Sequence, residues 1–97
     1  MLTPSETTLE QQRQLRELGA QHPAPTREEV MPDWKWVNAR LTEHVFDTPY
    51  PVSNKYIAVY NQQIVGSGDD QLQLRLDVAR KLGLHPERLV ITFVFGD

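Results

Sequence analysis

The chain has 97 residues, of which 39% are apolar and 24% charged, and its net charge is −3. This length suits one small domain, and the acidic balance argues against nucleic acid as a partner, because binding to phosphate needs a surplus of Lys and Arg. The absence of cysteine excludes disulfides, thiolate catalysis and cysteine-ligated zinc. The chain shows neither a secretory signal nor an apolar run near the roughly 20 residues of a membrane span, so we expect a cytoplasmic protein that does not bind membranes.

The first predicted helix begins at a capping-box pattern in residues 3–6 and runs to about Leu18, where Gly19 permits a left-handed cap. Its apolar stripe is narrow, with three leucines at Leu9, Leu15 and Leu18. We therefore expect the segment from Met1 to about Gln21 to be dispensable for folding.

A proline-rich linker and a second helix follow. Residues 26–29 repeat the capping-box pattern and predict one turn, which Pro32 ends. Asp33 then caps a longer helix from Trp34 to about His44. Its expected apolar face consists of Trp34, Val37, Leu41 and Val45. We accordingly divide the chain into a helical extension with linker (residues 1–32) and a helix plus β-β-α-β domain (residues 33–97).

A hairpin is predicted next, from strands at residues 56–60 and 63–67 joined by Asn61-Gln62. Asn tolerates the positive φ of a two-residue turn, although Gln62 stands where Gly is preferred. Strand alternation places Ile57 and Val59 on one face and the side chains of Tyr56, Ala58 and Tyr60 on the other.

The segment Gly66-Ser67-Gly68 lies between a strand and a helix. A phosphate-binding loop would need a following Lys and more glycines, so we interpret the glycines as a tight turn with positive φ. Asp69 or Ser67 caps the next helix and Asp70 supports its positive end. The helix has a stripe of Leu72, Leu76, Ala79 and Leu82 and ends at Gly83.

The last strand, residues 89–95, is almost continuously apolar, which is typical of burial on both faces. Placed beside the first strand, it pairs antiparallel and gives the strand order 2-1-3. The predicted fold is therefore α+β, a small β-β-α-β unit with the N-terminal helices packed on it. One helix covers one face, and the helix of Trp34 and Trp36 or a second copy of the protein covers the other.

Candidate catalytic groups are few. The histidines His22, His44 and His85 lie in separate segments without metal-ligand spacing, and the acidic pairs fall at helix starts, where the helix dipole explains them. No serine has a base nearby or a strained-elbow pattern. We therefore assign no catalytic, cofactor-binding or metal-binding residue and expect no cofactor. Whether the protein is an enzyme stays open, with the balance against it.

Aromatic residues and the last strand supply the candidate contact residues. Trp34 and Trp36 are two apart, so on a helix they point in different directions, and one is expected in the core and the other partly exposed. The strand at residues 89–95 has no charge, proline or bulge to protect an exposed edge. The expected partner contacts are Trp34, Trp36, Val90, Thr92 and Val94, in a homodimer or with an unidentified protein partner.

Two functions are consistent with this pattern. The first is a non-catalytic protein-interaction or accessory module, and the alternative is a subunit or minor enzyme with a small-ligand pocket between the N-terminal helices and the sheet.

Residues 55–60, 63–68 and 89–91 resemble a family of short bacterial and archaeal proteins of unknown function. Its pattern is K-Y-[IV]-A, a hairpin, a Gly-rich turn, a helix, a P-E turn and an apolar strand. The resemblance covers about Trp36 to Val94 and implies the fold, without catalytic residues.

Overall fold

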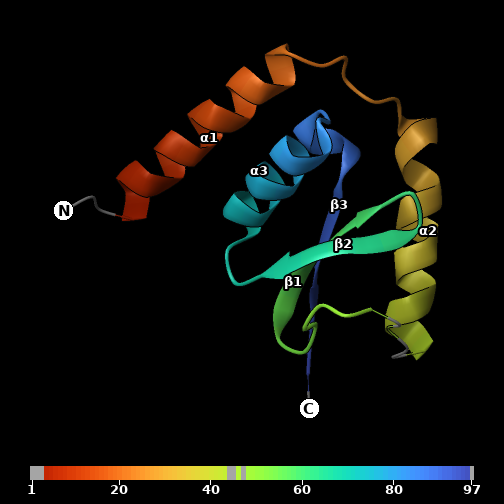
Figure 1. The fold of residues 1–97 in the computed structure, drawn as a ribbon. Helices are drawn as coiled ribbons and strands as arrows, with labels where there is room; N and C mark the ends of the chain where they lie inside the picture. The colour runs from red at the N-terminus through yellow and green to blue at the C-terminus, as the bar shows by residue number, and fades with distance from the viewer. Residues whose placement is uncertain (1–3, 44–45, 47, 97) are drawn as a thin grey trace.

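The computed structural model describes residues 4–43, 46 and 48–96, and it confirms the α+β class (Figure 1). Within these described residues, three helices, a short 3-10 turn and three strands follow one another. They are α1 (Pro4–Ala20), α2 (Arg27–Glu43), β1 (Lys55–Tyr60), β2 (Gln63–Gly68), α3 (Gln71–Leu82), η1 (Pro86–Arg88) and β3 (Val90–Val94).

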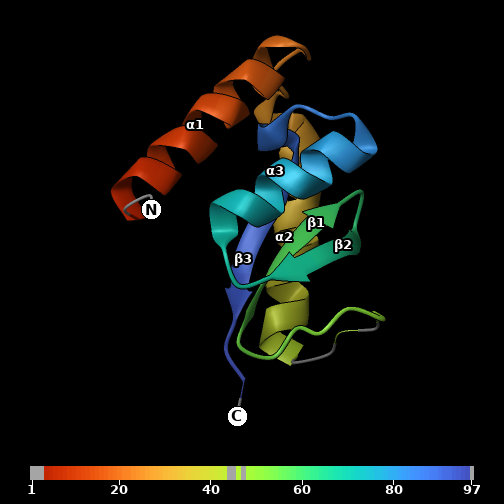
Figure 2. The ribbon, with the colours of Figure 1, turned by 60° about the vertical axis from the view of Figure 1, so that its left-hand side comes forward.

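The three strands form one antiparallel sheet in the order β2-β1-β3, as the sequence predicted. Figure 2 shows α3 on one side of the sheet and α2 on the other, and α1 packs on α3. The core is accordingly divided between the two faces. On the α3 face lie Ala58, Leu74, Leu76, Val78, Ala79, Leu89, Ile91 and Leu18. On the α2 face lie Val37, Ile57, Val59, Val90 and Val94.

The β1–β2 hairpin has the predicted two-residue turn. Asn61 has φ 56° and Gln62 has φ 60°, and positive φ at both positions defines the type I′ turn that matches the twist of a hairpin. Further along, Ala58 pairs with Gly66 but Val59 pairs with Ile64. One extra β2 residue therefore lies between these pairs, and β2, an edge strand, carries a bulge.

Helix α2 differs from the prediction, because it runs without a break from Arg27 to Glu43 through Pro32. A proline at the sixth helical position removes one backbone N–H donor, and anchors on both sides of it offset this loss. Before Pro32, Thr26 Oγ1 accepts from the N–H of Glu29 at 3.3 Å. After it, Asp33 and Val37 are buried. Asp33 is therefore not a helix cap, and α2 crosses the expected boundary at residues 32/33.

The apolar face of α2 also differs from the prediction. Trp34 is 37% exposed, whereas Val37 is buried and Leu41 packs against the same core cluster. Val30 occupies the position one turn before Asp33 and packs there too. The buried face of α2 is rotated away from Trp34 relative to the predicted face. It includes the buried Asp33. The expected position of Val45 lies outside the described residues.

Helix α1 extends past Gly19 to Ala20, so Gly19 is an internal residue of the helix and not its cap. A Cβ at Gly19 would lie 3.0 Å from Nε2 of His85, which shows that the glycine allows a close approach of the segment before η1. Leu18 and Gln11 are buried against the rest of the protein. That residues 1–21 are dispensable stays a prediction, and the expected cap at Thr3 lies outside the described residues.

Asp70 is the N-cap of helix α3 and accepts a hydrogen bond from the N–H of Gln73 at 3.1 Å, so neither Asp69 nor Ser67 is the cap. Gly83 ends the helix with φ 68°, as predicted. The expected stripe is wrong at Leu82, which is 40% exposed. Because α3 packs against both the sheet and α1, a wider arc is buried, including Leu74 and Val78.

The glycines before α3 have a different role from the one predicted. Gly66 and Gly68 lie within β2, and neither has a positive φ. A Cβ on Gly66 would lie 2.9 Å from Cγ2 of Val78, closer than carbon atoms pack. A Cβ on Gly68 would meet Leu74 at an ordinary 3.9 Å. Gly66 therefore allows α3 to approach β2 closely.

Candidate interaction surface

The two tryptophans of α2 point in different directions, as their spacing requires. Trp34 is partly exposed, and Trp36 is half-buried against the α2-face cluster. The guanidinium of Arg40 lies 5.2 Å from the centre of the Trp36 ring, within the range of a cation–π contact. Trp36 is therefore mainly a core residue, and Trp34 is the one available to a partner.

Of the candidate residues on β3, Val90 and Val94 have buried side chains and Thr92 is half-buried. Val90 and Val94 pack in the cluster beneath α2 together with Ile57. Their side chains are therefore occupied within the protein. A partner could reach the backbone of β3 and the side chains of the opposite, α3 face.

The direction of the β3 backbone follows from the register of the sheet. In a two-residue hairpin the flanking pair is hydrogen-bonded, so Tyr60 points its N–H and C=O toward β2. Alternation then turns Val59 and Ile57 toward β3, and their partners Val90 and Thr92 point inward. At the end of β1 the N–H of Lys55 donates to Val52, and the carbonyl of Val94 accepts instead from the N–H of Asn54 at 2.8 Å, so this carbonyl also points inward.

Ile91 and Phe93 therefore direct their N–H and C=O groups away from β1, toward the open side of β3. No strand pairs there within the described residues. We call this row of donors and acceptors the outer edge of β3. A further strand could pair with β3 by forming hydrogen bonds to these backbone groups.

An aromatic row lies along this edge on the α3 face. Tyr56 and Phe93 form an edge-to-face pair with ring centres 5.0 Å apart, and Phe93 and Phe95 form another at 4.9 Å. Phe95 is 80% exposed, and the chain beyond β3 runs past the end of α3 in both ribbon views (Figures 1 and 2). The strand expected to contact a partner, residues 89–95, includes Phe93 and Phe95, but the side chains named for contact were those of the other face. The i, i+2 spacing of Phe93 and Phe95 indicates that they share a face.

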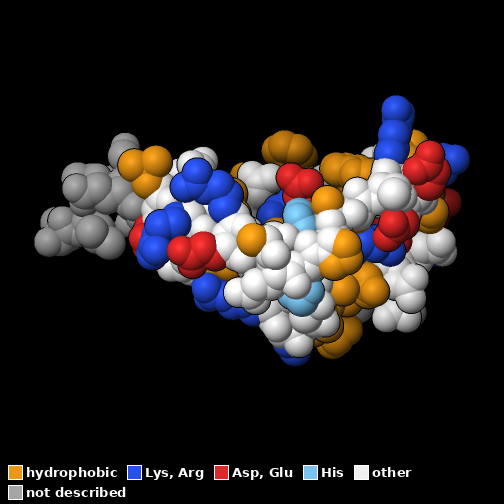
Figure 3. Space-filling model, turned by 90° about the horizontal axis from the view of Figure 1, so that it is seen from above, with side chains coloured by type: hydrophobic (Ala, Val, Ile, Leu, Met, Phe, Trp, Pro, Cys, Tyr) orange, Lys and Arg blue, Asp and Glu red, His pale blue; other side chains and the backbone are white. Residues whose placement is uncertain are grey.

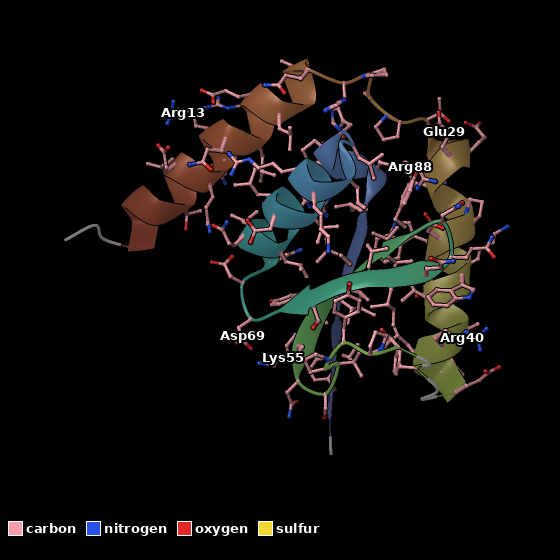
Figure 4. All side chains as sticks on the ribbon, viewed as in Figure 1. Arg13, Glu29, Arg40, Lys55, Asp69 and Arg88 are labelled. Atoms are coloured by element: carbon pink, nitrogen blue, oxygen red, sulfur yellow. The ribbon has the colours of Figure 1, made fainter. Side chains whose placement is uncertain are left out.

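A buried carboxylate holds the other end of the hairpin to α2. Asp33 is 1% exposed, and its Oδ1 accepts from the N–H of Gln62 at 2.7 Å. Its Oδ2 accepts from the N–H of Asn61 at 3.1 Å and from Nη1 of Arg88 at 2.7 Å. Arg88, labelled in Figure 4, also lies over the ring of Tyr60 at 4.7 Å. We call these residues the Asp33 clamp.

The Asp33 clamp was missed because Asp33 follows a proline, which favoured a capping role. The available signal was its position, since Asp33 stands three residues after Val30 and four before Val37, on the apolar face of a helix. A charged residue at such a position indicates a buried, paired group. The clamp also explains why Gln62 tolerates positive φ, because Asp33 binds the turn in that conformation.

The two aspartates at the start of α3 interact with other groups of the protein. The hydrogen bond from the backbone of Gln73, followed by one from the Gln11 side chain, holds the pKa of Asp70 below its usual value. The neighbouring Asp69 pairs with Lys55 at 2.7 Å, and both are labelled in Figure 4. The N-terminus of α3 is thus capped by a carboxylate, which is inconsistent with a phosphate loop there.

The histidines among the described residues lie in different segments. His85 caps η1, with Nδ1 accepting from the N–H of Glu87 at 3.1 Å. His22 lies in the linker after α1, and His44 falls outside the described residues. Within the part of the chain that the structure describes, no group of three or more His, Cys, Asp or Glu residues could hold a metal ion. Figure 3 shows acidic and basic side chains interspersed over the face seen from above.

No family model, no curated protein and no solved structure matches this chain. The resemblance to short bacterial and archaeal proteins therefore stays a prediction. Among the described residues, no helix is both long and apolar enough to span a bilayer. The cytoplasmic location likewise stays a prediction.

Proposed function

We propose that this protein is a non-catalytic interaction module that binds through the outer edge of β3, and that its partner is a second copy of the same chain. The observation that carries this proposal is the difference between the two edges of one sheet. The β2 edge has a bulge, two glycines and an exposed Gln63, which are features that discourage strand pairing. The β3 edge has the sequence Val-Ile-Thr-Phe-Val, with none of them.

Pairing two β3 strands antiparallel gives a two-fold dimer with a continuous six-stranded sheet, the isologous arrangement typical of homodimers. Centring the pair on Phe93 uses the outward backbone groups of Ile91 and Phe93. It also sets Ile91 of one copy opposite Phe95 of the other. This register brings the aromatic rows of both copies together and removes the exposed Phe95 ring from water, which favours association.

A matched pair of variants tests the pairing. Phe93→Ala and Phe93→Pro both lose the ring, but only the proline loses the outward N–H, which an edge strand can spare. We expect the wild type to sediment as a dimer, Phe93→Ala as a weaker dimer and Phe93→Pro as a monomer. At concentrations where Phe93→Ala has dissociated to a monomer, the two variants should have the same melting temperature. A monomeric wild type at millimolar concentration, or equal dimerisation of the two variants, would contradict the proposal.

The register has its own test, because the chain contains no cysteine and single-cysteine variants are therefore unambiguous. Antiparallel pairing centred on Phe93 places the two copies of that residue opposite each other, so Phe93→Cys should oxidise to a disulfide-linked dimer. Thr92→Cys, one residue away, should cross-link more slowly. Faster cross-linking at Thr92 would show a different register.

The alternative function, a ligand-binding subunit, is favoured by two hollows in the described part of the chain. One lies between α2 and the hairpin turn and is lined by Met31, Trp36 and Gln62 among others, near the expected place. The other is a cleft between α1 and α3, which does not reach the sheet.

A further inference from the structure

The cleft between α1 and α3 has a volume of about 510 Å³, and residues of η1 also line it. This size falls in the range of small-molecule sites. Its lining includes two arginines, a histidine, a glutamate and two leucines, which are Arg16, Arg75, His85, Glu87, Leu15 and Leu72. We call it the α1–α3 cleft, and neither the outer edge of β3 nor the Asp33 clamp contributes to it.

Arg75 is a half-buried cation whose charge the protein does not pair. Its Nη1 donates to the carbonyls of Pro86 at 2.8 Å and Leu89 at 3.1 Å, but it forms no ion pair with a carboxylate in the described part of the chain. Burial lowers the pKa of Arg75, and the charge of Glu87 opposes this effect. Glu87 acts on this charge without forming an ion pair, so an anion bound in direct contact would stabilise the half-buried cation further.

The guanidinium still has donors to offer. Every fully buried side-chain nitrogen or oxygen among the described residues has a hydrogen-bond partner. Nε and Nη2 of Arg75 make no hydrogen bond within this part of the chain, so they are not fully buried, and Arg75 lines the cleft. A guanidinium with two free N–H groups matches the two oxygens of a carboxylate or phosphate.

A second cation and a ring donor stand on the same cleft. Arg16 reaches it from α1 and is exposed, with no ion pair among the described residues. Because Nδ1 of His85 accepts from Glu87, the neutral ring carries its proton on Nε2. Glu87 is the one acidic lining residue, so the two guanidinium groups leave the cleft with a net positive charge.

We propose that the α1–α3 cleft binds a small organic anion with a carboxylate or phosphate head and an apolar body. The head pairs with Arg75 and Arg16, and the body lies against Leu15 and Leu72. Both leucines are only partly buried in the structure, so covering them with an apolar group adds favourable burial. This activity is independent of strand pairing at β3.

Phenyl phosphate and benzoate are suitable probes, with phenol as the neutral control of the same shape. We expect saturable binding of at least one anion by calorimetry, and the tighter of the two identifies the preferred head group. Phenol should bind at least tenfold more weakly, because it lacks the charge. Failure of both anions to saturate, or phenol binding as tight as theirs, would overturn the proposal.

Charge variants locate the binding. Arg16→Gln should weaken binding by about tenfold, the effect of one charge-assisted contact, while Lys81→Gln, the same charge change on the exposed face of α3, should have no effect. Glu87→Gln should tighten binding, because it removes the acidic lining residue. Equal losses in Arg16→Gln and Lys81→Gln, or weaker binding in Glu87→Gln, would show that the anion is not bound in the cleft.

Arg75→Lys provides the test of geometry. It keeps the positive charge but replaces the fork of donors with a single ammonium, so binding should weaken while the variant still melts cooperatively. Unchanged affinity in a folded Arg75→Lys variant would remove Arg75 from the site.

Discussion

The Asp33 clamp provides the strongest test of how this fold is held together. Asp33→Ala removes an acceptor of three hydrogen bonds, two of them from the backbone of a turn in which Gln62 has positive φ. It also leaves Arg88, whose side chain is 18% exposed, without its carboxylate. Removing one partner of a buried ion pair costs about 3–5 kcal/mol. The total stability of a small domain is about 5–15 kcal/mol, so we expect a large part of it to be lost.

Urea unfolding followed by tryptophan fluorescence measures this loss. The matched control is Asp69→Ala, which removes the ion pair of Lys55 with an aspartate that is 79% exposed, and an exposed pair contributes at most about 1 kcal/mol. A loss below about 1 kcal/mol in Asp33→Ala, similar to that of the control, would refute the reasoning that the clamp anchors the hairpin to α2.

Two further variants separate the parts of the clamp. Arg88→Met in the Asp33→Ala background removes the unpaired cation, so the double variant should be more stable than Asp33→Ala alone. Gln62→Gly should stabilise the wild type by about 1 kcal/mol, because glycine adopts positive φ without strain. If Gln62→Gly destabilises the protein instead, the turn is not under the strain inferred from its φ.

Two other predictions follow from α3. Gly66→Ala should cost about 1–3 kcal/mol in urea unfolding, because its Cβ would lie 2.9 Å from Val78, whereas Gly68→Ala should be nearly neutral; equal effects would contradict the close-approach role. Asp70→Ala should lose about 1 kcal/mol at pH 7 with the cap of α3. Because hydrogen bonding, first from Gln73, lowers the pKa of Asp70, its contribution is complete above the unfolded-state value of about 3.9 and is lost as the pH falls through the lower folded value. The stability difference from wild type should therefore shrink at acidic pH, and a constant difference would contradict this assignment.

Local patterns in the sequence were sufficient to predict the strands, the hairpin turn and the end of α3 in the C-terminal half of the protein. Alternation separated the two faces of β1, the Asn61-Gln62 pair identified the hairpin turn, and Gly83 identified the end of α3. Strand order followed as well, because the strand after α3 pairs antiparallel with β1 more readily than parallel with β2. These features depend on neighbours in the chain, which a sequence displays directly.

Features that depend on distant contacts could be decided only by the tertiary structure. Pro32 predicts a helix end locally, but burial of Asp33 and Val37 keeps α2 continuous. Gly66 is a strand residue beneath Val78, not a turn residue, because α3 packs there.

The candidate sites depend on distance in the same way. Asp33 and Arg88 are 55 residues apart, and the α1–α3 cleft joins Arg16 to Arg75. No local pattern records such pairs, because the energy of a buried charge depends on which groups the fold brings to it. The sequence by itself determined the strands, the turn and the class of fold, and tertiary packing decided which polar groups are paired and which remain available for binding.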